Sequence, residues 1–200
     1  KSRIDESLER YSVMRALSAI RRCDVAIIVM DATAEISAQD VRIAGLVHEE
    51  GKASILVMNK WDLIDKDTNT IYEYKKMIGN NLTFMNYAPS IFISAKTGRR
   101  VDKIMELVDN VYGNSIQRIK TGVLNDCLYE ATAMFQPPSD KGRRLKLYYC
   151  TQVSIKPPTF VIFVNDKELV HYSYERYIEN FFRKTFNFEG TPIRIIFRQK

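Results

Sequence analysis

Cysteine and histidine are scarce in this sequence of 200 residues, and their scarcity excludes several kinds of site. Cys23, Cys127 and Cys150 are odd in number, lie far apart and form no CxxC pair. This pattern argues against a disulfide framework and against a zinc site. Only two histidines are present, so a histidine-based metal centre is not expected either. We predict a chain without metal ligands in a reducing, cytoplasmic environment.

The chain also has no hydrophobic run long enough to cross a bilayer. The longest purely aliphatic run is residues 25–30, whereas a transmembrane helix needs about 20 apolar residues. No secretory signal is visible at the N-terminus, and because Lys1 is not an initiator methionine we expect further chain upstream. Apolar residues make up 46% and charged residues 27%, which is typical of a folded globular domain. We expect no interaction with a membrane.

Positive charge is concentrated in the C-terminal part of the chain. Residues 1–117 hold 16 Lys and Arg against 16 Asp and Glu, whereas residues 118–200 hold 14 against 8. The whole net charge of +6 therefore lies after residue 117. This asymmetry predicts two modules, of which the second faces a polyanion. A basic surface that serves only solubility is the alternative.

Short apolar segments alternate with amphipathic segments through residues 1–117. The predicted strands are residues 25–30, 54–58 and 91–93, and the predicted helices are residues 5–20, 37–50, 70–79 and 101–112. Ser37 and Asp40 form a capping signal for the second helix, and Gly51 follows where that helix should end. Because apolar strands alternate with helices, we predict an α/β fold in which helices cover both faces of a parallel sheet.

The pattern of the sequence changes after residue 117. Apolar residues recur at helical spacing over residues 121–135 and 174–186, and strand-like segments lie at residues 145–149, 160–164 and 193–198. The resulting order is helix, strand, strand, helix, strand. It predicts a small α+β domain over residues 118–200.

The segment Asn59-Lys60-Trp61-Asp62 follows directly on the strand predicted over residues 54–58. Ligands of open α/β sheets bind at the carboxyl ends of strands. Asp62 can accept hydrogen bonds from the N1–H and the exocyclic amine of guanine, whereas adenine would leave its carboxylate unpaired. Asn59 can donate to the base edge while it ties neighbouring loops together, and the stem of Lys60 can lie along the base plane. A helix cap after a strand is the alternative.

A second loop, Ser94-Ala95-Lys96, follows the next predicted strand. The backbone N–H of Ala95 could donate to the 6-oxygen of guanine, a contact that the amine of adenine cannot accept. Either loop alone is weak evidence, since short motifs recur by chance. Two such loops after consecutive strands predict a guanine-nucleotide site. Its candidate residues are Asn59, Lys60, Asp62, Ser94, Ala95 and Lys96.

Residues 1–117 resemble the C-terminal part of a translation-factor-type, Ras-like GTPase domain, and the whole chain resembles the bacterial Der (EngA) GTPase family. The family-specific part is C-terminal and includes Lys141-Gly-Arg-Arg-Leu-Lys-Leu-Tyr-Tyr149 and Phe188-Glu-Gly-Thr-Pro192. The family carries two tandem GTPase domains followed by a KH-like domain, which residues 118–200 resemble. The resemblance implies GTP and GDP as ligands, Mg²⁺-dependent hydrolysis in the complete protein, an upstream GTPase domain as a partner, and a role in assembly of the large ribosomal subunit.

Two motifs of such GTPase domains do not occur in the sequence. There is no GxxxxGK[ST] and no DxxG, so the phosphate-binding loop and the usual Mg²⁺-binding residues are missing. These motifs precede the guanine loops in a GTPase, so we expect the chain to begin inside the second switch region. We assign it a partial P-loop-type domain with no catalytic residue.

Basic residues of the C-terminal domain predict contact with ribosomal RNA. A KH domain clamps nucleic acid with a GxxG loop, but Gly122, Gly142 and Gly190 do not have that spacing. We therefore assign the contact to charge, which gives affinity without reading a base sequence. The candidate residues are Lys141, Arg143, Arg144 and Lys146. A solvated strand edge is the alternative for this cluster.

The aromatic residues are also concentrated after residue 117, where 14 of the 22 lie. Stacking on unpaired bases is one use of such rings, but the helical spacing over residues 174–186 favours core packing. We expect Trp61 to pack beneath its loop, and we interpret Asp31 as a turn cap outside the site. Two alternatives for the whole protein are a non-enzymatic RNA-binding scaffold with a vestigial nucleotide fold and an interaction domain without nucleic acid.

Overall fold

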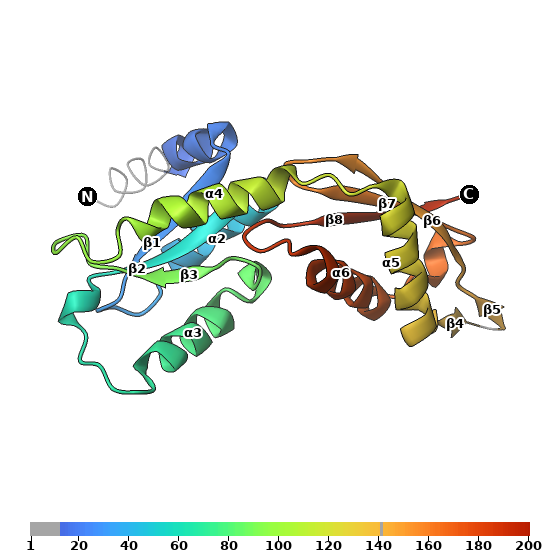
Figure 1. Ribbon diagram of the computed structural model, residues 1–200. Coiled ribbons are helices and arrows are strands. Elements are labelled where there is room, and N and C mark those ends of the chain that lie inside the picture. The colour runs from blue at the N-terminus through green and yellow to red at the C-terminus, as the bar shows by residue number, and fades with distance from the viewer. Residues whose placement is uncertain (1–12, 141) are drawn as a thin grey trace, which may run out of the picture. The chain divides into compact units, whose positions relative to one another are not determined.

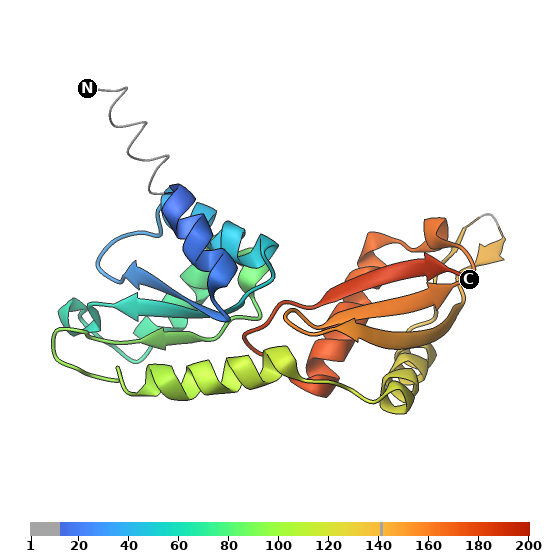
Figure 2. The same ribbon diagram turned by 90° about the horizontal axis from the view of Figure 1, so that it is seen from above.

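The computed structural model describes residues 13–140 and 142–200. These residues form two compact units, and the boundary between them falls after Tyr112, inside the helix α4 (Lys103–Ile116). The first unit is of the α/β type and the second is of the α+β type (Figure 1, Figure 2). The domain boundary that we predict after residue 117 lies just beyond the end of this helix.

Three parallel strands form the sheet of the first unit. They are β1 (Val25–Asp31), β2 (Ala53–Asn59) and β3 (Ser90–Phe92), in the order β1-β2-β3. All three strands are predicted from the sequence, and the parallel arrangement is confirmed. Because a helical crossover returns the chain to the same end of the sheet each time, the carboxyl ends of the three strands lie side by side. This edge carries both candidate loops.

The helices of the first unit begin and end close to their predicted limits. Residues 13–22 are helical, and the rest of the helix predicted over residues 5–20 lies outside the described residues. The other helices are α2 (Ala38–Glu49), α3 (Thr70–Asn81) and α4. α2 starts with the predicted capping box, in which Ser37 and Asp40 each accept the other's backbone N–H. Gly51, at φ 70°, follows the end of α2 in the left-handed conformation that glycine favours.

Hydrophobic side chains pack on both faces of this sheet, as predicted. Successive residues of a strand point to opposite faces, and β2 is buried on both. Leu56 and Met58 join a cluster with residues of α2, α3 and the helix at 13–22. Ile55 and Val57 join a second cluster that includes Val111 of α4. β2 is therefore the central support of the first candidate loop, which follows it directly.

The strand β1 is less buried than its uninterrupted apolar sequence predicts. Ile28 and Met30 are buried, but the side chains of Ile27 and Val29 are 43% and 56% exposed. β1 is an edge strand of the described sheet, and Ile27 and Val29 take no part in the cluster that α4 forms. An apolar run indicates that both faces of a strand are buried, but it does not show which element of the fold packs on each face.

The second unit has the predicted order of helix, strand, strand, helix, strand. Its helices are α5 (Thr121–Met134) and α6 (Tyr172–Phe186), and its main strands are β6 (Leu147–Ser154), β7 (Thr159–Val164) and β8 (Arg194–Gln199). β6 and β7 are antiparallel, and β7 and β8 are parallel. A two-stranded ribbon of β4 (Ser139–Asp140) and β5 (Arg143–Arg144) precedes β6. Both helices lie on the same side of the three-stranded sheet (Figure 1).

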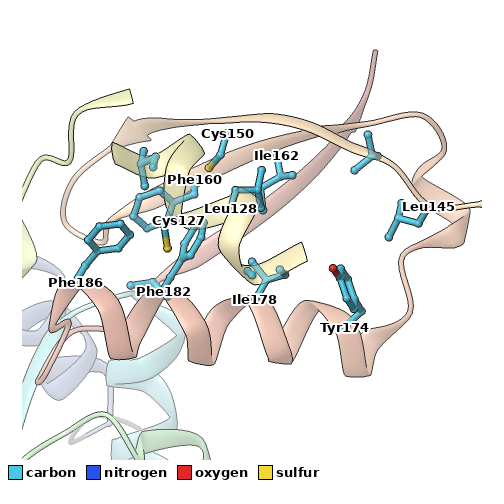
Figure 3. Close-up of a cluster of buried hydrophobic side chains, with 14 of the residues drawn as sticks. Cys127, Leu128, Leu145, Cys150, Phe160, Ile162, Tyr174, Ile178, Phe182 and Phe186 are labelled. Carbon is cyan, nitrogen blue, oxygen red and sulfur yellow. The ribbon is translucent and has the colours of Figure 1, made fainter. Parts of the chain in front are cut away.

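A continuous core fills the space between this sheet and its two helices. Figure 3 shows Phe160 and Ile162 of the sheet directed toward Ile178 and Phe182 of α6. The hydroxyl of the buried Tyr174 donates to the carbonyl of Phe135 at 3.1 Å. The interpretation of the aromatics at 174–186 as core residues is thus confirmed, since the buried ones recur at helical spacing. They are Tyr174, Phe182 and Phe186.

Two aromatic positions of the second unit differ from prediction. Phe135 is the last residue of the helical spacing predicted over residues 121–135, which indicates burial, but it caps the end of α5 and is 58% exposed. The strand predicted over residues 145–149 begins at Leu147 and extends to Ser154. Its register shifts between Leu147 and Tyr149, so the alternation fails there and both Tyr148 and Tyr149 are exposed.

Candidate functional site

The first candidate loop is held in place by the residue between its polar members. Asn59 ends β2, Lys60 takes a left-handed φ of 62°, and Trp61 begins the short helix η1 (Trp61–Leu63). Trp61 is buried, and its ring lies 4.9 Å from that of Tyr74 and 4.5 Å from that of Phe92. As predicted, the tryptophan packs beneath the loop and anchors it to the core.

Hydrogen bonds join the first loop to the second. The Trp61 N–H donates to the carbonyl of Ile93 at 2.9 Å, and the Ala95 N–H donates to Asn59 Oδ1 at 3.0 Å. Asn59 therefore ties the neighbouring loop, as its residue type and place predict. The bond fixes the amide oxygen on the second loop, so Nδ2 is the atom of Asn59 that can donate to a base.

The predicted contact from the Ala95 N–H to a guanine oxygen is not tested by this arrangement and stays a prediction. In this structure that N–H is already engaged by Asn59. A guanine oxygen that accepts from the Ala95 N–H must therefore share this donor with Asn59 Oδ1 or displace Asn59 Oδ1 from it.

Ser94 connects the second loop to the carboxylate of the first. Its side chain is fully buried, its hydroxyl accepts the Thr97 N–H at 3.2 Å, and it makes a hydrogen bond to the exposed side chain of Asp62. That bond is the main reason why the pKa of Asp62 lies below the usual value of an aspartate, and the positive charge of Lys96 also lowers it. Asp62 is thus an ionised acceptor at neutral pH.

The side chains of both loops meet at one small cavity. Its volume is about 350 Å³, and it lies at the carboxyl end of the sheet, where parallel α/β sheets bind their ligands. Ser94 does not line the cavity itself, but it holds Asp62, which does. The lining residues are Asn59, Lys60, Asp62, Leu63 and Lys96.

Asp31 belongs to the surroundings of this cavity, although we predict it only as a turn cap. It ends β1 and pairs in register with Asn59. Its carboxylate accepts hydrogen bonds from the Lys60 ammonium and from the N–H and hydroxyl of Thr33. These bonds, the one from Lys60 first, lower the pKa of Asp31 to about 2. A polar residue at the carboxyl end of a neighbouring strand is the sequence signal that could have placed it there.

The candidate RNA-contact residues lie on and beside the β4–β5 ribbon of the second unit. Arg143 donates to Asp166 at 3.0 Å, and Arg144 donates to Gln136 at 3.1 Å. The side chains of Arg143, Arg144 and Lys146 are exposed, whereas Lys141 lies outside the described residues. The arginines are held by neighbours but open to solvent, an arrangement that fits phosphate contact and a solvated strand edge equally well.

The described ranges contain no cluster of three or more His, Cys, Asp or Glu side chains arranged for a metal ion. Within the same ranges, no helix combines the length and the hydropathy that a bilayer crossing requires. Cys127 and Cys150 are buried free thiols in the second core, and burial raises the pKa of Cys150 to about 12. Both cysteines therefore act as small core residues.

Comparison with known protein families defines the class of each unit. Residues 11–114 match the Elongation factor Tu GTP binding domain, and residues 118–198 match the KH-domain-like region of EngA bacterial GTPase enzymes, C-terminal. The first match alone covers more than half of the chain. Together with the fold, the matches define a GTP-binding α/β domain followed by a small KH-like domain.

Curated relatives match the chain over its whole length. GTPase Der of Acetivibrio thermocellus and GTPase Der of Ruminiclostridium cellulolyticum are each 58% identical over 200 residues. GTPase Der of Lachnospira eligens is 57% identical over the same length. The chain belongs to the Der (EngA) family of GTPases. It covers 46%, 45% and 45% of these three proteins, so it spans about half the length of the curated relatives it matches.

Solved structures show a weaker likeness. A probable GTP-binding protein engB has a TM-score of 0.47 at 20% identity, over 56% of this chain and 69% of that chain. A variant of Aquifex aeolicus Era bound to GDP.AlF4⁻ has a TM-score of 0.42 at 16% identity, over 92% of this chain and 67% of that chain. Neither TM-score reaches 0.5, so these likenesses carry no conclusion about ligands or partners.

Proposed function

We propose that the first unit recognises the guanine base of GTP and GDP and that the complete protein hydrolyses GTP. One observation carries the proposal: Asp62 is held by Ser94, and Asn59 is held by Ala95. The two loops therefore present an ionised carboxylate and an amide to one cavity as a single unit. Guanine offers two adjacent donors to such a carboxylate, whereas adenine offers none.

The remaining candidate residues shape the cavity around a flat base. Lys60 and Lys96 both line it, and long basic side chains can lay their apolar stems along a ring while the charged ends stay in water. The ammonium of Lys60 is drawn to Asp31, which fixes the direction of its stem. Lys96 adds positive charge beside Asp62.

Hydrolysis is assigned to the complete protein because the phosphate-handling motifs do not occur in these 200 residues. The support is the family, whose 58% identical members are named GTPases and are about twice as long as this chain. Mg²⁺ bound by the complete protein would offset the negative charge of the phosphates in such a reaction. Within this chain, the assigned work is to bind and orient the base.

We further propose that the KH-like unit contacts ribosomal RNA and that the complete protein acts in assembly of the large ribosomal subunit in the cytoplasm. The upstream GTPase domain of the same protein is the second proposed partner. The support is that the whole net charge of +6 lies after residue 117 and that Arg143, Arg144 and Lys146 are exposed. Contacts of this kind bind phosphates and weaken steeply as salt rises.

The specificity of the complete protein for the base tests the nucleotide part of this proposal. Asp62→Asn should weaken GDP binding by about a hundredfold or more, because a site built around a substrate hydrogen bond rejects a mismatched group strongly. The same variant should gain affinity for XDP, whose 2-oxo group can accept from the new amide. Asp65→Asn, an exposed carboxylate three residues away, is the control and should change neither affinity.

Full GDP preference in the Asp62→Asn variant would show that the cavity is not a guanine site. RNA binding by the complete protein should also differ between its GTP and GDP forms. RNA binding that ignored the nucleotide would instead favour a non-enzymatic scaffold.

A further inference from the structure

The sheet of the KH-like unit has two faces, and its core uses only one of them. Phe160, Ile162 and Val164 of β7 belong to the core beneath α5 and α6 (Figure 3). Side chains alternate along a strand, so Val161 and Phe163 point to the opposite face. Neither of these two residues belongs to the core cluster, although Val161 is buried and Phe163 is half-buried.

Three side chains form one row across this opposite face. Tyr149 of β6 pairs in register with Phe163 of β7, which pairs in turn with Arg198 of β8. The rings of Tyr149 and Phe163 are stacked, with their centroids 4.4 Å apart and their planes at 17°. Tyr149 is 39% exposed, and Arg198 is also exposed. Aromatic rings in such a position, beside a basic side chain, form a platform on which unpaired bases can stack.

Tyr148 and Lys200 extend the row at one end. The register shift between Leu147 and Tyr149 interrupts the alternation of β6, and Tyr148 is 48% exposed. The Lys200 ammonium lies 5.4 Å from the centroid of the Tyr148 ring. We call these five residues the outer sheet face: Tyr148, Tyr149, Phe163, Arg198 and Lys200.

The charged residues of the three strands are all of one sign. β6, β7 and β8 contain no aspartate or glutamate, while β8 contributes Arg194 and Arg198. The first acidic residue after β7 is Asp166, which is paired with Arg143. The face is therefore complementary to a polyanion. Because the bases of a duplex are stacked inside it, exposed rings favour a polyanion whose bases are unpaired.

We propose that the outer sheet face binds single-stranded RNA. Tyr149 and Phe163 stack with unpaired bases, and Arg198 and Lys200 contact the flanking phosphates. This inference rests on the proposed contact of the KH-like unit with RNA, and it adds the place and the class of RNA. It does not depend on the arginines of the β4–β5 ribbon, whose contact with phosphates would be independent of base pairing.

The experiment measures RNA binding by the complete protein with fluorescence anisotropy. The probes are a labelled oligouridylate and an RNA duplex of the same length. Tyr149→Ala should weaken oligouridylate binding about tenfold, since base–aromatic stacking contributes substantially per base. It should change duplex binding by less than about twofold, because phosphate contacts dominate there.

Matched variants separate stacking from charge and from folding. Tyr129→Ala removes a ring that is 76% exposed from α5, on the helical side of the unit, and should leave oligouridylate binding unchanged. Tyr149→Phe keeps the ring and should retain binding. Arg198→Gln should reduce the salt dependence of oligouridylate binding, whereas Arg176→Gln on α6 should not. Unchanged melting temperatures identify the variants that fold normally.

Several outcomes would overturn the inference. Equal effects of Tyr149→Ala and Tyr129→Ala would do so, as would equal loss of single-stranded and duplex binding in Tyr149→Ala. Tyr149→Ala could instead leave RNA binding unchanged and weaken only the binding of the separate 200-residue chain to the upstream domain. The outer sheet face would then be a contact surface for protein. Failure of the unaltered protein to bind either RNA at low salt would refute the proposed RNA contact as a whole. If Tyr149→Ala bound both probes as tightly as the unaltered protein does, the proposed role of the outer sheet face would be refuted. The proposed RNA contact of the KH-like unit would still stand.

Discussion

Ser94→Ala is the perturbation that tests most directly how the two candidate loops work together. The Ser94 side chain is fully buried, and it links Asp62 of the first loop to the Thr97 N–H of the second. Removing the hydroxyl deletes both bonds and leaves a small void. A net contribution of about 1 kcal/mol per hydrogen bond gives an expected destabilisation of about 1–2 kcal/mol.

The loss of affinity should be larger for the nucleotide than for an unrelated ligand, because Ser94 holds Asp62, the carboxylate that we propose to read the base. We expect the affinity of the complete protein for GDP to fall about fivefold, the equivalent of one average hydrogen bond. The Ser94 bond is also the main cause of the lowered pKa of Asp62, so the variant should raise that pKa toward its usual value. The proposed base recognition requires the ionised form of Asp62, which is lost as the pH falls through its pKa. The variant should therefore lose GDP at a higher pH than the unaltered protein does.

The assay is a titration of a fluorescent GDP analogue against the complete protein over a series of pH values. Ser90→Ala is the matched control, because Ser90 begins the strand β3, after which Ser94 follows. Equal GDP affinity and equal pH dependence in the two variants would refute the link from Ser94 to Asp62. A fall in affinity with no change in its pH dependence would mean that Ser94 acts only through the stability of the loop.

Three further predictions address other contacts. Asp31→Asn removes the charge that holds the Lys60 ammonium and should lower GDP affinity severalfold, measured by calorimetry. In the unaltered protein, the ion pair of Asp31 and Lys60 should persist on acidification until the pH falls through about 2, the pKa of Asp31. Phe182→Ala, at a fully buried position, should lower the free energy of unfolding of the KH-like unit by about 3–5 kcal/mol in urea, whereas Tyr172→Ala, 67% exposed, should lower it by less than about 0.5 kcal/mol. Arg144→Gln should reduce the slope of log affinity for RNA against log salt by about 1, and an unchanged slope would place this side chain away from phosphates.

Most elements of the fold could be predicted because their signals are local. The capping box of Ser37 and Asp40, the apolar strand before Asn59 and the helical spacing of Tyr174, Ile178 and Phe182 each lie within a few residues of one another. Burial of one helix stripe or of both strand faces follows from such patterns. The parallel sheet follows in turn, since strands separated by helices pair in that way.

The site was predictable to the extent that the carboxyl ends of consecutive strands had to meet. This reasoning applies to Asn59, Asp62 and Ser94, which the structure joins through hydrogen bonds. It applies equally to Asp31 at the end of β1, but its side chain has a second use as a turn cap, which its sequence context favours. Only the position of the Lys60 ammonium shows that Asp31 also holds a residue that lines the cavity.

The sequence by itself determined the elements, their order and the chemistry at the strand ends, because these depend on residues that are neighbours in the chain. The tertiary structure decided which side chains share a partner. Ile27 and Val29 are exposed because β1 is an edge strand of the described sheet. Tyr149 pairs with Phe163 because the register of β6 shifts after Leu147, and Phe163 pairs in turn with Arg198 across the parallel strands β7 and β8. Strand register depends on contacts between distant segments, which no local pattern of residues encodes.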